Sequence, residues 1–205
     1  MTDKKDVLRP SLWTPRPVNE TIAVYADWAD NYDAEITSRG YRTPDRLAAA
    51  LSKFVPAETP ILDFGCGTGI GGAALIRAGF RTIDGTDITK EMLDKALARG
   101  IYRKAWHSTP SDMGFAVGAY AVIVAVGVIS LGAAPAEALQ PLVDKLLPGG
   151  HLALSFNDPT RADQSYTDAM KAICDAGHAE LVFREHGPHL EDVGMGSDII
   201  VLRRQ

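Results

Sequence analysis

One stretch of twelve residues, ILDFGCGTGIGG at positions 61–72, constrains the fold of this chain more than any other. Its first four residues are mostly apolar, carry an acid at Asp63, and predict a buried strand. Alternate glycines at Gly65, Gly67 and Gly69 follow, and then a helix-forming run. A strand, a tight glycine turn and a helix bring backbone N–H groups and the positive end of the helix close to a ligand. The sequence therefore predicts the principal ligand site at this turn.

Two classes of ligand are compatible with the turn. Gly67, Gly69 and Gly72 satisfy the dinucleotide pattern G-x-G-x-x-G, which a glycine-rich segment also meets by chance. The wider pattern D-x-G-x-G-x-G, from Asp63 to Gly69, favours a ligand with a cationic amino-acid end. An acid just before the turn attracts an ammonium group and repels a pyrophosphate. S-adenosylmethionine is a ligand of this kind.

The motif DFGCGTG at 63–69 resembles the first motif of class I S-adenosylmethionine-dependent methyltransferases. Three further segments, YADWADNYD at 25–33, GYRTPDRLAAAL at 40–51 and TDITKEMLDKALARGIY at 86–102, are similar to the Williams–Beuren syndrome region methyltransferase-like proteins. The likeness covers roughly residues 20–175. It implies S-adenosyl-L-methionine as the cofactor and methyl transfer as the reaction, and it implies no particular acceptor.

Alternating strand and helix patterns predict an α/β fold, a three-layer Rossmann-like sandwich around a seven-stranded, mostly parallel sheet. The continuous apolar run at 120–128 is typical of a central parallel strand buried on both faces. Two late strands, near 179–186 and 197–203, are joined without a helix and are therefore expected to pair antiparallel. The methyltransferase resemblance implies such a C-terminal hairpin, which a standard dinucleotide domain lacks.

The chain is expected to consist of an N-terminal arm followed by one domain. Prolines in residues 1–18 predict an extended arm. Residues 19–205 are expected to form a single methyltransferase domain, with a helical lid at 19–58 and a cofactor-binding core at 59–205. Within the lid, aromatic and apolar residues at three- and four-residue spacing predict one helix from about 19 or 21 to 38.

Candidate ligand contacts follow the predicted strands. Asp87 ends the second strand 20 residues after Gly67, where it can accept hydrogen bonds from both ribose hydroxyls. The resemblance implies that Ile88 packs on the adenine, with Met92 beside it. Tyr32, in a segment resembling a W-x-x-x-Y-D lid motif, is expected to touch cofactor or substrate. Cys66 is expected to line the loop and not to act as a nucleophile.

The resemblance implies that the adenine amine finds its acceptor after the third strand, where Ser108, Ser111 and Asp112 are candidates and Asp112 is favoured. Taken together, the predicted cofactor-binding residues are Tyr32, Asp63, Gly65, Cys66, Gly67, Gly69, Asp87, Ile88, Met92, Asp112 and Val126.

No residue is predicted to be catalytic. The segment after the 120–125 strand reads Val126-Gly127-Val128-Ile129, without the Asn/Asp-Pro-Pro-aromatic tetrapeptide of enzymes that methylate amino groups of nucleic acids and proteins. Because S-adenosylmethionine carries an activated methyl group, alignment and exclusion of water can suffice. If a base is needed, Tyr32, Tyr166 and the histidines are the candidates.

Composition and charge argue against several classes of binding partner. The formal net charge of −5 argues against a nucleic-acid substrate, and no apolar run reaches the ~18–20 residues that span a bilayer. Cys66 and Cys174 are the only cysteines and lack metal-site spacing, so neither a disulfide scaffold nor a metal site is expected and the cytoplasm is the expected location. A short lid without an extra domain favours a small-molecule acceptor. The sequence predicts no oligomeric state.

Three alternatives stay open at this point. A nicotinamide-dependent oxidoreductase explains Gly67, Gly69 and Gly72 but leaves Asp63 and the terminal strand pair unexplained. A non-catalytic module that binds S-adenosylmethionine and regulates a partner would carry the same loop. An aminopropyltransferase that uses the decarboxylated cofactor shares the fold, but no paired acids mark its amine site.

Overall fold

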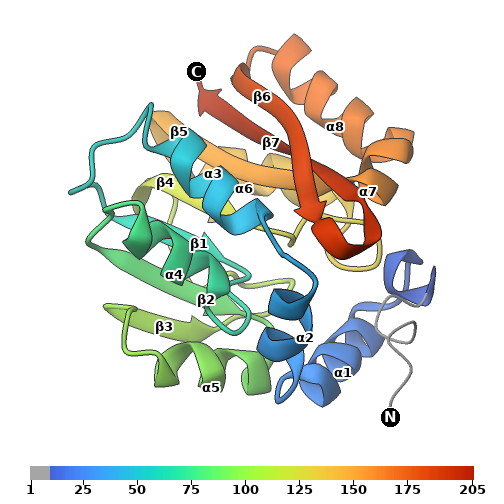
Figure 1. Cartoon of the computed structure of the whole chain (residues 1–205). Coiled ribbons are helices and arrows are strands. Elements are labelled where there is room, and N and C mark those ends of the chain that lie inside the picture. The colour runs from blue at the N-terminus through green and yellow to red at the C-terminus, as the bar shows by residue number, and fades with distance from the viewer. Residues whose placement is uncertain (1–9) are drawn as a thin grey trace.

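A seven-stranded sheet forms the centre of the computed structural model, which describes residues 10–205 (Figure 1). Its strand order is β3-β2-β1-β4-β5-β7-β6. The first five strands run parallel, and β7 pairs antiparallel with both β5 and β6. The predicted fold class and the antiparallel C-terminal hairpin are therefore confirmed. The strands are β1 (Ile61–Phe64), β2 (Ile83–Asp87), β3 (Lys104–His107), β4 (Tyr120–Ala125), β5 (Leu146–Asn157), β6 (Ala179–Leu190) and β7 (Met195–Arg204).

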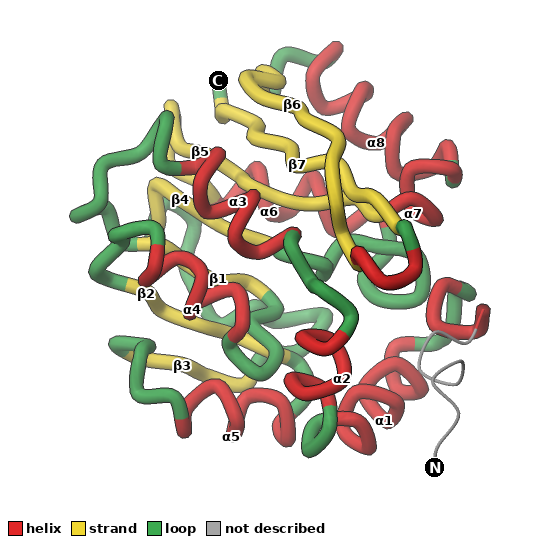
Figure 2. The backbone as a smooth tube through the Cα atoms, in the orientation of Figure 1, coloured by secondary structure: helices red, strands yellow, loops and turns green. Residues whose placement is uncertain are grey.

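Helices cover both faces of the sheet (Figures 1 and 2). Helices α3 and α4 share one apolar core with the sheet, and α6 and α8 share the core on the opposite face. The helices are α1 (Val18–Trp28), α2 (Tyr32–Ser38), α3 (Thr43–Leu51), α4 (Ile70–Arg77), α5 (Lys90–Ala98), α6 (Leu139–Lys145), α7 (Asp158–Ala162) and α8 (Gln164–Asp175), with 3-10 turns η1 (Pro10–Trp13), η2 (Ala136–Ala138) and η3 (Glu191–Val193). Within residues 10–205, no helix is long and apolar enough to cross a bilayer.

The prediction of one continuous helix over 19–38 is wrong. The segment forms two helices, α1 and α2, separated by the turn at 29–31. Trp28 stabilises this break, because its ring packs edge-on against Tyr32 with centroids 4.7 Å apart and its Nε1 donates to Glu35 Oε2 at 2.8 Å. The break turns α2 so that it lies beside the carboxyl ends of the parallel strands (Figure 1).

A buried carboxylate, Asp84, joins three strands near their amino ends, at the end of the sheet away from α2. Asp84 in β2 is fully buried. It accepts hydrogen bonds from Arg103 Nε at 2.9 Å, just before β3, and from the Tyr120 hydroxyl at 2.6 Å, at the start of β4. Since burial without partners would be costly, this pairing fixes the amino ends of β2, β3 and β4.

Asp84→Ala is expected to lower the free energy of unfolding by about 2–3 kcal/mol, because it leaves the buried Tyr120 hydroxyl without its acceptor and removes a bidentate ion pair. Urea denaturation measures the effect. The matched control is Asp94→Ala, which breaks the exposed pair with Lys90 on α5 and should change stability little. Equal stability of the Asp84 and Asp94 variants would contradict this assignment.

Candidate functional site

The turn after β1 is held in a backbone conformation that favours glycine. Gly65, Gly67 and Gly69 have φ angles of +67°, +54° and +90°. The Cys66 N–H donates to the Thr86 carbonyl at 3.0 Å and ties the turn to β2. Helix α4 begins directly after the turn at Ile70. The loop backbone therefore lies at the carboxyl ends of the parallel strands, where ligands bind in open α/β folds.

Two adjoining cavities open at this turn. The larger has a volume of about 570 Å³ and lies at the carboxyl ends of β1, β2 and β4. The smaller, of about 40 Å³, surrounds Asp63. Because both are lined by Tyr32, Gly65, Gly67 and Val126, we treat them as one cleft.

Asp63 lines the smaller cavity and is only 1% exposed. Its Oδ2 accepts a hydrogen bond from the Tyr102 hydroxyl at 2.7 Å. Burial raises the pKa of Asp63 to about 7, the hydrogen bond from Tyr102 opposes this rise, and the nearby Asp87 charge adds to it. The arrangement favours a cationic ligand group, because a cation would allow the buried carboxylate to ionise.

Asp87 is oriented by two backbone N–H groups. Its Oδ2 accepts from Gly67 N–H and its Oδ1 from Thr89 N–H, each at 2.7 Å. Burial raises the pKa of Asp87, while these two backbone hydrogen bonds lower it. The side chain lines the larger cavity, with lone pairs left to accept from ligand hydroxyls.

The structure brings most of the other predicted site residues to the same cleft. Ile88 and Met92 line the larger cavity, and Tyr32 and Val126 line both. Cys66 lines the smaller cavity, and burial raises the pKa of its thiol, so the thiol is protonated near neutral pH. This is consistent with a lining role for Cys66.

Asp112 is the exception among the predicted contacts. It is exposed and lies outside the lining of both cavities. Its backbone pairs with Thr109, and its carboxylate accepts the Gly114 N–H at 2.8 Å, which keeps it in a local turn. Ser108 and Thr109 line the larger cavity, whereas the structure does not bring Asp112 to it.

Several lining residues were missed from the sequence. Pro15 and Arg16 line the larger cavity, so this part of the predicted 1–18 arm belongs to the site; residues 1–9 lie outside the described part of the chain. The segment 132–138 after β4 also lines it, as does Tyr166 of α8, which the sequence suggested only as a base. No local motif marks these positions, because long-range packing brings them to the cleft.

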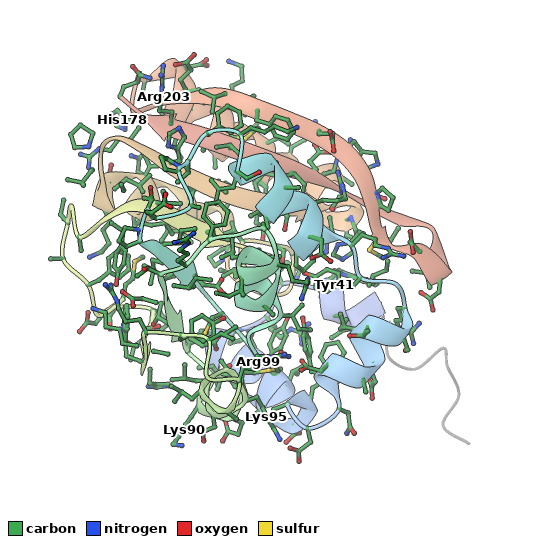
Figure 3. All side chains as sticks on the ribbon, turned by 60° about the vertical axis from the view of Figure 1, so that its left-hand side comes forward. Tyr41, Lys90, Lys95, Arg99, His178 and Arg203 are labelled. Carbon is green, nitrogen blue, oxygen red and sulfur yellow. The ribbon has the colours of Figure 1, made fainter. Side chains whose placement is uncertain are left out.

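Charged contacts connect the lid helix α2 to the glycine turn at 65–69 and to α5. The Asp33 carboxylate of α2 accepts from the Thr68 hydroxyl and pairs with Arg99, just after α5. Arg99 Nε also donates to the Thr68 carbonyl at 2.6 Å, and Lys95 pairs with Asp30 at 2.6 Å. Figure 3 shows Lys95 and Arg99 with the lid helices close by. These contacts hold α2 against the glycine turn.

Within the described residues, 10–205, no group of three or more His, Cys, Asp or Glu side chains is arranged to hold a metal ion.

Residues 36–193 match the family model of the methyltransferase domain. The chain is 31% identical over 164 residues to human methyltransferase-like protein 27, a match that covers 76% of this chain and 65% of the human protein. It is 28% identical over 163 residues to ribosomal protein L11 methyltransferase of Shewanella piezotolerans, covering 77% of this chain and 46% of that protein. The chain thus spans less than two thirds of the length of these relatives.

Solved structures show the same fold. Magnesium protoporphyrin IX methyltransferase from Synechocystis PCC 6803, solved with bound S-adenosylmethionine, superposes with a TM-score of 0.62 at 19% identity, covering 100% of this chain and 99% of that one. A putative methyltransferase solved in complex with the Haloferax volcanii Trm112 activator superposes with a TM-score of 0.69 at 15% identity, covering 92% and 97%.

The chain therefore belongs to the methyltransferase domain family. The class I S-adenosylmethionine-dependent methyltransferase recognised from the glycine motif is confirmed, and so is the resemblance to the Williams–Beuren region group.

Asp63→Asn is expected to stabilise the ligand-free protein near neutral and alkaline pH. A carboxyl whose folded pKa is raised to about 7 contributes stability below about pH 4 and loses it as the pH rises through 7. An amide avoids that loss and can still accept the Tyr102 hydrogen bond. The gain in free energy of unfolding should grow from near zero at about pH 4 to about 1–4 kcal/mol at about pH 8. Denaturation across this pH range measures it.

Asp112→Asn, a change at an exposed carboxyl, is the matched control and should show no such gain. An Asp63→Asn variant whose stability follows wild type at every pH would contradict the buried, raised-pKa assignment.

Arg99→Ala is expected to loosen the lid, because it removes both the Asp33 ion pair and the bond to Thr68. Hydrogen–deuterium exchange of α2 should become about tenfold faster, as expected when local opening becomes easier by ~1.4 kcal/mol. Lys90→Ala removes an exposed ion pair within α5 and serves as the control. Unchanged α2 exchange in Arg99→Ala would show that the lid does not depend on this contact.

Proposed function

We propose that this chain transfers a methyl group from S-adenosylmethionine to a small-molecule acceptor. The observation that carries the proposal is the pair of buried acids, Asp63 and Asp87, on the two sides of the glycine turn within one cleft. An ammonium group fits the Asp63 end, and vicinal ribose hydroxyls fit Asp87. The family match supports the same reading.

The remaining lining suits the other parts of this cofactor. Ile88 and Met92 offer apolar surface to an adenine ring, with Ser108 and Thr109 close to them along the larger cavity. The positive-φ glycines let backbone groups approach the ligand closely. When bound, S-adenosylmethionine supplies a methyl group activated by its sulfonium sulfur.

The size and lining of the larger cavity support a small, largely apolar acceptor. Its volume of about 570 Å³ would have to hold the adenosine part of the cofactor as well as the acceptor, and single small-molecule sites alone take ~300–1,000 Å³, so the acceptor would have to be small. Val18 and Tyr25 from α1 face the cavity, together with Pro141 of α6 and Tyr166 of α8. The net charge of −5 does not favour a nucleic-acid acceptor.

The chain's own contribution is to align the acceptor and exclude water. Burial raises the pKa of Tyr25 and of Tyr32, and it raises the pKa of Tyr166 to about 12. These phenols therefore stay protonated near neutral pH and can donate hydrogen bonds to an acceptor. The lid contacts at Asp33 cover the turn and limit access of water. This favours catalysis by alignment over catalysis by a tyrosine base.

Two observations weigh against the alternatives. The Asp63 carboxylate in the cleft and the antiparallel β6–β7 pair, which a standard dinucleotide domain lacks, disfavour a nicotinamide site. The apolar part of the cleft beside α6 and α8 gives room for an acceptor, which disfavours a purely regulatory module.

Cys66 and Cys174 are both free thiols, which supports a reducing location such as the cytoplasm.

The test is a calorimetric titration with S-adenosylhomocysteine, run beside NADH, followed by a screen of small acceptors with S-adenosylmethionine. We expect binding of S-adenosylhomocysteine alone and its production during turnover. Asp87→Ala should weaken that binding by about 10–100-fold, the factor for a charge-assisted hydrogen bond of ~1.5–3 kcal/mol. Asp112→Ala is the control and should bind normally. Binding of NADH alone, or unchanged binding by Asp87→Ala, would contradict the proposal.

A further inference from the structure

We propose that Tyr102 is a positioning residue for cofactor binding: its hydroxyl holds the Asp63 carboxylate in place to receive the ammonium group of the amino-acid end. This inference deepens the proposed function and rests on it. Tyr102 lies outside the glycine motif, between α5 and β3, and lines neither cavity. It therefore acts through Asp63 and not on the ligand itself.

The contact is short and buried. The Tyr102 hydroxyl donates to Asp63 Oδ2 at 2.7 Å, while Asp63 faces the smaller cavity. Because Asp63 sits on β1 and Tyr102 follows α5, the hydrogen bond joins two elements 39 residues apart in the chain. It reaches the carboxylate from outside the cleft and leaves the cavity side for a ligand.

Three glycines form a slot for the Tyr102 side chain. A β-carbon on Gly72 of α4 would lie 2.4 Å from the Tyr102 hydroxyl oxygen. A β-carbon on Gly85 of β2 would lie 3.0 Å from two ring carbons, and one on Gly69 would lie 3.2 Å from the ring. Any larger residue at Gly72 would displace the hydroxyl. In this chain, the last glycine of the G-x-G-x-x-G pattern therefore makes room for the Tyr102 hydroxyl.

The electrostatic surroundings of Asp63 explain why the hydrogen bond matters. Its titratable neighbours are Tyr102, Asp87, Tyr41 and Cys66. Burial raises the pKa of Asp63 to about 7 and the Asp87 charge raises it too, whereas the hydrogen bond from Tyr102 and, to a smaller extent, one from the Gly72 backbone N–H lower it. Burial and the Asp63 charge also raise the pKa of Tyr102, so its hydroxyl keeps the proton that it donates. Loss of that donor would leave Asp63 more often protonated and less able to bind an ammonium group.

Tyr102→Phe tests the proposal, because it keeps the ring in the glycine slot and removes only the hydroxyl. Wild type and variant are titrated with S-adenosylhomocysteine and with 5′-methylthioadenosine, which has the adenosine but no amino-acid end. We expect roughly tenfold weaker binding of S-adenosylhomocysteine at about pH 7 and an unchanged affinity for 5′-methylthioadenosine. The pH below which S-adenosylhomocysteine binding declines should also move upward in the variant.

Tyr120→Phe is the matched control. It removes a hydroxyl that donates to another buried carboxylate, Asp84, at 2.6 Å, away from the cleft, and it should leave both affinities unchanged. If Tyr102→Phe does not fold, Gly72→Ala provides a second route, since its methyl group displaces the hydroxyl and should cause the same selective loss.

Each other result overturns the inference. Equal weakening of both ligands would mean that Tyr102 only supports packing, and unchanged S-adenosylhomocysteine binding would mean that Asp63 does not need it. Failure of wild type to bind S-adenosylhomocysteine would overturn the proposed function as well, and this outcome is seen before any variant is measured.

Discussion

The burial of the Asp63 carboxylate at the end of β1 is the constraint on which the site depends. Asp63 is almost fully buried, close enough to Asp87 for the two charges to interact, and its pKa is raised to about 7. Such a group destabilises the ligand-free fold whenever it is ionised. A cationic ligand group would remove that penalty, so in the proposed function the same feature that costs stability would give affinity and selectivity for an amino-acid end.

The sheet topology and the glycine turn position Asp63 and Asp87 close to each other. The strand order places β2 and β4 on either side of β1, so Asp63, Asp87 and Val126 meet at one edge of the sheet. Positive-φ glycines keep the turn tight, and Asp33 of α2 fastens the lid to it. The buried Asp84 network joins β2, β3 and β4 at their amino ends, away from the cleft.

The sequence predicted those residues of the candidate cleft whose positions a local pattern encodes. The glycine turn, Asp63, Asp87 and the apolar pair after Asp87 lie in or next to strand ends, where a motif and the strand period fix their positions. The break between α1 and α2 was not predictable, because Trp28 and Tyr32 fit a single helix equally well by spacing. Asp112 was chosen from a loop whose turn geometry the sequence does not specify. The proposed role of Tyr102 has no local motif, because the space for its side chain comes from three glycines in separate elements.

The most direct test of the central claim is the number of protons released when S-adenosylhomocysteine binds, measured by calorimetry in buffers of different ionisation enthalpy. If the ligand's ammonium group forces ionisation of Asp63, binding at about pH 7 should release roughly half a proton, since the pKa of Asp63 is about 7. Binding of 5′-methylthioadenosine, or binding to Asp63→Asn, should lack this contribution. Release of no proton by wild type, or equal release with both ligands, would contradict an ammonium site at Asp63.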